Sequence, residues 1–192
     1  MIALQNRIEP GFGFFVALSA FLLLDRSGLG AMCVAAALLH ELGHLAAMAL
    51  FRVKVVRVRL RTLEVGIERN PAPSLCSELL IDLAGPAANL LLAAACYAVG
   101  NLAFSAVNCA LGLFELCPLP SLDGGQALFV LAQRLFSLER ARWLCGAVGA
   151  VVLLGVLGAG IFLAVRDKNF TLFLLLVVLS AALCSAKKRG KR

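Results

Sequence analysis

The sequence predicts an all-α polytopic membrane protein of about six transmembrane helices, with a small membrane-surface β-hairpin between helices 2 and 3. Of the 192 residues, 61% are hydrophobic and only 15% are charged. A typical soluble domain is about half apolar and about a quarter charged. Several apolar runs approach or exceed the roughly 18 residues that indicate a membrane span. The composition therefore excludes an ordinary soluble domain.

Charged and turn-forming residues divide the apolar sequence into its helices in order. The first run is short for a span and, with Arg7 ahead of it, resembles a signal-peptide core. It lacks a convincing cleavage site, which favours an uncleaved helix. Pro118 and Pro120 end the fourth helix. The predicted helices span residues 11–24, 29–51, 77–99, 102–117, 141–165 and 169–186.

In the linker at 52–70, the hydrophobic residues recur with a different period from that of the apolar helices. Apolar and charged side chains alternate at Val56–Leu60 and again at Leu63–Ile67. Alternation with a period of two predicts two short strands that turn near Arg61–Thr62, half buried against the membrane surface. The alternative is an irregular basic loop on lipid headgroups.

We expect one integral-membrane domain over residues 1–192. Its catalytic core covers about 29–136, its packing or gating helices about 141–186, and its basic cytoplasmic tail 187–192. The seven cysteines form no C-x-x-C pair and most lie in apolar runs, so they indicate neither a disulfide framework nor a zinc knuckle.

The lysines and arginines predict the orientation. An N-terminus in the cytoplasm puts fifteen of the 18 basic residues on the cytoplasmic side. This positive-inside bias predicts a multi-pass integral membrane protein with both termini in the cytoplasm. Because topology explains the charge of +7, we expect no nucleic-acid partner.

The segment "HELGH" at 40–44 lies within an otherwise apolar helix. Positions i and i+4 share a helix face, so His40 and His44 can present imidazoles to one ion. Glu41 flanks that face, as in the H-E-x-x-H arrangement in which the glutamate is a general base beside zinc. The alternative is a histidine pair hydrogen-bonded to neighbouring helices. The topology puts His44 roughly 10 Å inside the cytoplasmic end of its helix at about 1.5 Å per residue.

A two-histidine site needs another protein ligand, and the chain has no third histidine. The candidates are the acids Glu78, Asp82, Glu115 and Asp123. Asp123 lies in "CPLPSLDGGQALF", on the side of the membrane predicted for His44. Asp123 and Gln126 also fit a helix N-cap with its capping box, and this role is compatible with ligation.

Three ordered motifs give the chain a family resemblance. With "HELGH" in an early span, "AGPAAN" at 84–89 and "PLPSLDGG" at 118–125, it resembles the site-2 protease family of intramembrane zinc metalloproteases. Its small size is similar to the compact, stage IV sporulation protease-like branch. The resemblance implies a bacterial cell membrane and an active site within the bilayer near the cytoplasmic face.

The resemblance also implies roles for individual residues. His40, His44 and Asp123 would bind one zinc ion per chain, and Glu41 would activate water. Asn89, Gly85 and Pro86 would help to position substrate. Glu115 stands where the family usually has an asparagine, and Asn108 lies too far upstream to be an obvious substitute. Glu115 would be a hydrogen-bond partner or an acid close to the ligands, and we include it with the positioning residues.

The implied partners are the lipid bilayer, a membrane-protein or membrane-associated substrate such as a pro-sigma or anti-sigma factor, and a regulatory membrane partner. Two alternatives stay open. One is a metalloprotease with its third ligand on a downstream glutamate helix. The other is a non-catalytic membrane metal-binding protein or a metal transporter.

Overall fold

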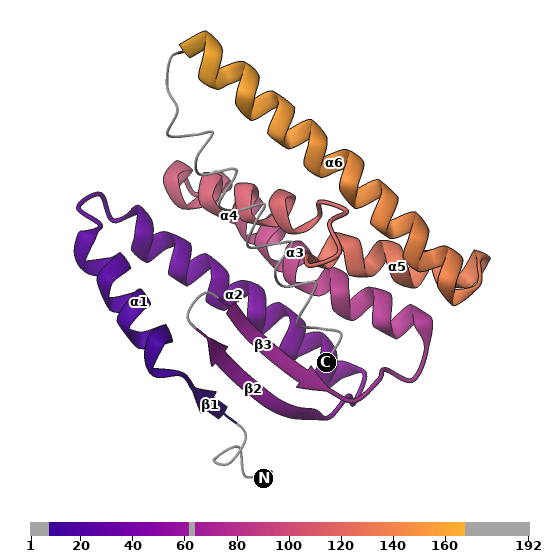
Figure 1. Cartoon of the computed structure of the whole chain (residues 1–192). Helices are drawn as coiled ribbons and strands as arrows, with labels where there is room; N and C mark the ends of the chain where they lie inside the picture. The colour runs from indigo at the N-terminus through magenta and orange to yellow at the C-terminus, as the bar shows by residue number, and fades with distance from the viewer. Residues whose placement is uncertain (1–7, 62–63, 168–192) are drawn as a thin grey trace. The chain divides into compact units, whose positions relative to one another are not determined.

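The computed structural model describes residues 8–61 and 64–167, and the chain divides into two compact units, Met1–Phe114 and Glu115–Arg192. The first contains β1 (Ile8–Pro10), α1 (Phe12–Leu24), α2 (Leu29–Leu50), β2 (Val55–Arg61), β3 (Glu64–Arg69), α3 (Leu75–Ala98) and nearly all of α4 (Leu102–Glu115). The second contains α5 (Asp123–Leu135) and α6 (Leu138–Asp167) (Figure 1).

Helices of membrane-spanning length confirm the predicted class of protein. The segments Leu29–Leu50, Leu75–Ala98 and Leu138–Phe162 are long and apolar enough to cross a bilayer. The apolar helices Phe12–Leu24 and Leu102–Glu115 are shorter. The predicted helices at 11–24, 29–51, 77–99, 102–117 and 141–165 correspond to α1–α4 and α6. The predicted helix at 169–186 lies outside the described residues.

The predicted hairpin forms, and a third strand joins it. β2 pairs antiparallel with β3, and Arg61 pairs with Glu64 next to the position where the alternation predicted the chain to reverse. β1 pairs parallel with β2, so the strand order is β1-β2-β3. β1 was not predicted, because three residues are too few to show a period of two. The alternative of an irregular loop is wrong.

The two faces of this sheet differ in chemistry. Val55 and Ile67 pack against a buried cluster of Met48, Val53 and Ile81, which joins the hairpin to α2 and α3. Successive strand residues point to opposite faces, so Glu68 lies on the other side from Ile67. That side carries an ion-pair ladder, formed by Glu9, Arg57, Arg59 and Glu68.

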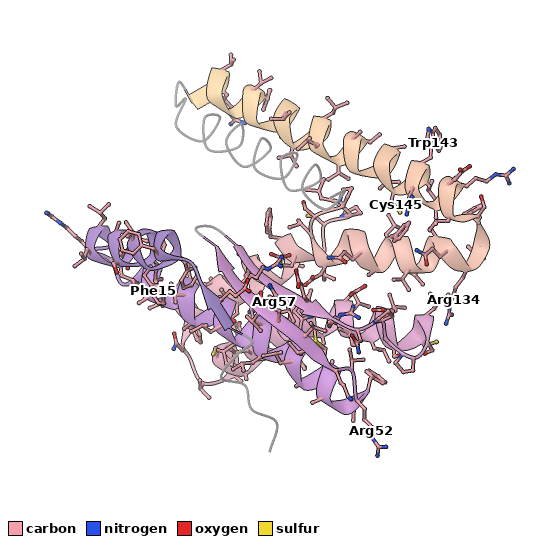
Figure 2. The ribbon with its side chains drawn as sticks, turned by 60° about the horizontal axis from the view of Figure 1, so that its bottom comes forward. Phe15, Arg52, Arg57, Arg134, Trp143 and Cys145 are labelled. Atoms are coloured by element: carbon pink, nitrogen blue, oxygen red, sulfur yellow. The ribbon has the colours of Figure 1, made fainter. Side chains whose placement is uncertain are left out.

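The second unit contains the helical hairpin α5–α6. Ala132 of α5 packs with Ala141 and Cys145 of α6 in a small buried cluster. Trp143 points outward from the start of α6 and is 75% exposed (Figure 2). An exposed indole at the end of a membrane helix is typical of an interfacial anchor.

The turn between α1 and α2 is held by one carboxylate. The Ser27 hydroxyl donates to Asp25 Oδ1 over 2.7 Å, and the Gly30 N–H donates to Oδ2 over 2.7 Å. Gly28, with φ 77, adopts the left-handed conformation that favours glycine. The Ser27 side chain, followed by backbone N–H groups that include Gly30, holds the pKa of Asp25 below its ordinary value.

A lowered pKa means that the folded turn favours ionised Asp25. Its stabilising effect is therefore complete above the ordinary carboxyl pKa of about 3.9 and is lost as the pH falls through the folded-state value. We expect Asp25→Ala to speed amide exchange at Gly30 at pH 6, and this difference should disappear in strong acid. Asp25→Asn retains one acceptor oxygen without titrating and is the control. A difference that persists where Asp25 is protonated would contradict the electrostatic explanation.

Candidate metal centre

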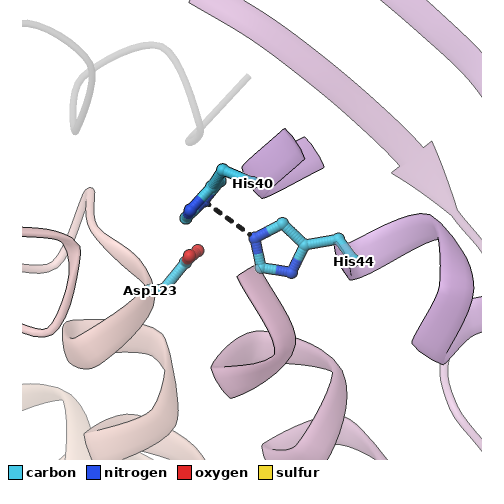
Figure 3. A group of neighbouring side chains, drawn as sticks. All are labelled: His40, His44 and Asp123. Carbon is cyan, nitrogen blue, oxygen red and sulfur yellow. Dashed lines mark hydrogen bonds between the residues drawn. The ribbon is translucent and has the colours of Figure 1, made fainter. Parts of the chain in front are cut away.

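The helical spacing brings the two histidines of "HELGH" together. His40 and His44 lie one turn apart on α2, and both are buried, with 6% and 8% of their surface exposed. Their Nε2 atoms are 3.1 Å apart (Figure 3). The predicted common face therefore exists, and it presents one nitrogen from each ring.

The other ring nitrogens determine the tautomers. His44 Nδ1 lies 2.7 Å from the Ile81 carbonyl oxygen, which can only accept, so Nδ1 carries the proton. His40 Nδ1 lies 2.8 Å from Asn89 Oδ1 and donates to it. In both neutral rings Nε2 is then an unprotonated acceptor.

Two lone pairs that face each other at 3.1 Å require a cation between them. A proton would bury an imidazolium charge in the helix interior, which is costly. A metal ion uses both lone pairs and leaves each Nδ1–H hydrogen bond in place, as metal-ligating histidines usually do. The donor set therefore fits a metal that prefers imidazole nitrogen, such as zinc.

Glycines make space for the rings where α2 meets α3. A Cβ on Gly85 would contact Nε2 of His44 and would lie 2.7 Å from Cε1 and Nε2 of His40. On the facing helix, a Cβ on Gly43 would lie 2.7 Å from the Ala84 carbonyl oxygen. α3 continues as a helix through Pro86, which is fully buried. The "AGPAAN" motif thus provides the wall against which the imidazoles lie.

Asn89 is completely buried between three helices. Besides accepting from His40, it donates to the Ala36 carbonyl of α2 over 3.1 Å and to Asn108 Oδ1 of α4 over 2.9 Å. Every polar atom of its side chain is thus hydrogen-bonded, and Asn89 contacts His40 rather than open space. A role for Asn89 in positioning substrate remains a prediction.

Two of the four candidate acids pair with an arginine. Arg69, at the end of β3, forms ion pairs with Glu78 at 2.5 Å and with Asp82 at 3.4 Å. The ion pairs with Arg69 explain why both carboxylates lie buried or half-buried on α3, and no metal ion is needed for this. Glu41 follows His40 on α2 and is half-buried, and Glu115 is the last residue of α4.

Asp123 is the first residue of α5, after an N-cap at Leu122 that makes no side-chain cap bond. The expected N-cap role of Asp123 is therefore wrong. Gly124 and Gly125 are required here, because a Cβ on either would collide with the backbone carbonyl of Leu116 or Leu119. Asp123 as the third ligand stays a prediction.

Comparison with known proteins adds the fold. No family model matches the sequence, and no curated protein sequence matches it. The solved structure of the site-2 protease from Methanocaldococcus jannaschii superposes with a TM-score of 0.65, over 92% of this chain and 89% of that chain, at 20% identity. The chain has the site-2 protease fold.

The site-2 protease fold confirms the architecture that the three motifs predicted, while the sporulation-like branch and the substrate-positioning roles stay predictions. Two contributors to the centre were missed. The Ile81 carbonyl has no sequence signal, because any residue supplies one. Asn108 had a signal, since an amide within an apolar span is costly unless it has a partner.

The space at Gly85 gives a direct test of the centre. We expect Gly85→Ala to weaken zinc binding by about tenfold or more, comparable with the loss of a hydrogen-bond partner of a metal ligand, because the added methyl displaces both imidazoles. Affinity is measured by chelator competition in nanodiscs. Gly155→Ala on α6 is the matched control, because its Cβ would meet nothing within 4 Å. Equal affinities of the two variants would contradict this geometry.

Proposed function

We propose that this chain is a zinc metalloendopeptidase that hydrolyses peptide bonds in or near transmembrane segments of membrane-associated proteins. The observation that carries the proposal is the buried His40–His44 pair, whose Nε2 lone pairs converge at 3.1 Å on a membrane-type helix. Ionisable groups at such depth are expensive and usually functional. The site-2 protease fold supports the same reaction class.

His40, His44 and Asp123 would hold the zinc ion. Two imidazoles and one carboxylate form a donor set typical of catalytic zinc, which keeps a further position open for water or substrate. When bound, zinc supplies a Lewis acid that polarises the scissile carbonyl and makes water nucleophilic at neutral pH. The converging Nε2 atoms of His40 and His44 and the site-2 protease fold support this assignment.

Glu41 is the proposed general base. An ionised carboxylate can accept the proton that water loses as its oxygen bonds to the peptide carbon. The same carboxyl group then gives that proton to the departing amine, so the C–N bond breaks without releasing an unprotonated amide anion. Its place next to His40 on α2 keeps it beside a ligand.

The substrate must present an extended segment, because a helix hides its carbonyls in backbone hydrogen bonds. We propose membrane-associated substrates such as pro-sigma or anti-sigma factors. The proposed setting is a bacterial cell membrane, with both termini in the cytoplasm. The active site would lie nearer the cytoplasmic face of the bilayer, and a membrane protein would regulate it. Polar side chains gathered at one centre, without repeats of the kind found in transporters, favour catalysis over ion transport.

Removal of the base tests catalysis separately from metal binding. We expect Glu41→Gln to reduce cleavage of a co-reconstituted single-span or pro-sigma substrate by at least about 100-fold, the usual contribution of a general base. Zinc content should remain that of the native chain. Glu139→Gln, the same change at an exposed acid of α6, should cleave normally. Equal cleavage by the Glu41→Gln variant and the native chain would refute the mechanism.

The third ligand can be identified by comparing two aspartates. We expect Asp123→Asn to weaken zinc binding by more than about 100-fold, because a direct ligand matters more than the hydrogen-bond partners whose loss costs 10–100-fold. Asp82→Asn is the matched control, since Asp82 has Arg69 as its ion partner. Chelator competition gives both affinities. Zinc loss in the Asp82 variant alone would assign the ligand to α3 instead.

A further inference from the structure

We infer that Asn108 is a positioning residue for the metal centre, acting through Asn89 to fix the tautomer of His40. The inference rests on the proposed zinc site and adds a residue to it. Asn108 is wholly buried on α4, and its amide is hydrogen-bonded at both ends.

The hydrogen-bond chain has a defined direction. Asn108 Nδ2 donates to the Phe104 carbonyl over 2.9 Å. A backbone carbonyl only accepts, so the NH₂ group of Asn108 must face it and Oδ1 must face Asn89. The first amide in the chain is therefore oriented by the backbone of its own helix.

The same logic orients the second amide. Asn89 Nδ2 has two acceptors around it, Asn108 Oδ1 at 2.9 Å and the Ala36 carbonyl at 3.1 Å. Turning this amide over would put its oxygen against both of them. Asn89 Oδ1 must therefore face His40, where it accepts the Nδ1 proton over 2.8 Å.

The proton position on His40 decides whether the ring can bind a metal. With Nδ1 protonated, Nε2 carries the lone pair that faces the centre. With Asn89 turned over, its NH₂ would favour an unprotonated Nδ1 and move the proton to Nε2, which blocks ligation. Asn108 opposes that turn by occupying one of the two donors of Asn89.

His44 provides an internal reference for this effect. Its Nδ1 donates to the Ile81 carbonyl over 2.7 Å, so its tautomer is set without either asparagine. The chain contains only two histidines, so ¹⁵N-histidine labelling reports these two rings alone. A change confined to His40 can thus be distinguished from a general disturbance of the site.

The test compares Asn108→Leu with Asn108→Asp in full-length, metal-free protein in nanodiscs. Leucine has a similar branched shape but no acceptor, whereas protonated aspartate keeps an acceptor oxygen for Asn89 and a hydroxyl that can donate to the Phe104 carbonyl. We expect the leucine variant to give ¹⁵N shifts of mixed tautomers at His40 alone and to weaken zinc binding by about tenfold, the lower end for partners of metal ligands. The aspartate variant should restore both properties toward the native values.

Ser105→Ala is the matched control for helix packing. Its hydroxyl donates to the Ala93 carbonyl over 2.7 Å, so it also joins α4 to α3 but does not touch the asparagine chain. It should lower thermal stability without changing the His40 tautomer or zinc affinity. Asn108→Ala, with a smaller side chain, serves as a second variant if the leucine variant does not fold.

Native tautomer and zinc affinity in the Asn108→Leu or Asn108→Ala variant would overturn the inference. Equal loss of zinc affinity in Ser105→Ala would overturn it too, because packing would then be the cause. The outcome is separable from the proposed function, since the tautomer is measured without metal or substrate. A native chain that cleaves nothing would refute the protease while the assignment of Asn108 could still be correct.

Discussion

The structure depends on two imidazole lone pairs held face to face inside an apolar helix layer. At 3.1 Å, the Nε2 atoms of His40 and His44 repel each other unless a cation joins them. Both rings nevertheless stay in place because each Nδ1 donates a hydrogen bond to α3. His40 donates to Asn89 and His44 donates to the Ile81 carbonyl. The surrounding helices thus stabilise an arrangement that is unfavourable by itself and becomes favourable with a cation.

Close approach of α2 and α3 is the condition for this arrangement. Gly43 lets α2 come near the Ala84 carbonyl, and Gly85 leaves the volume that the two rings fill. Where α3 meets α4, a Cβ on Gly112 would be 3.2 Å from the Pro86 carbonyl oxygen. Small residues at contacts of this kind are typical of membrane helices, whose backbones approach closely. Here they also determine where the two imidazole rings lie.

Much of this architecture could be predicted from the sequence, because membrane helices and strands have strong periodic signals. α1–α4, α6 and the hairpin follow from apolar runs and alternation. The histidine pair follows from helical spacing alone. α5 was harder: the helix is only 13 residues long and contains several polar residues, and Asp123 suggested an N-cap that the structure places at Leu122. Contacts such as His44 with the Ile81 carbonyl depend on how two helices meet, which no local pattern encodes.

The ion-pair ladder on the sheet shows that part of the positive charge of the linker at 52–70 is neutralised in the folded protein. Arg57 and Arg59 contact Glu9 and Glu68, so the charges of these two arginines are matched in space by carboxylates from two other strands. The electric field of alternating charges falls off faster with distance than that of a cationic patch, and salt screens it further. This face of the sheet therefore exerts little long-range electrostatic attraction on charged molecules, and any contact made there depends on short-range fit.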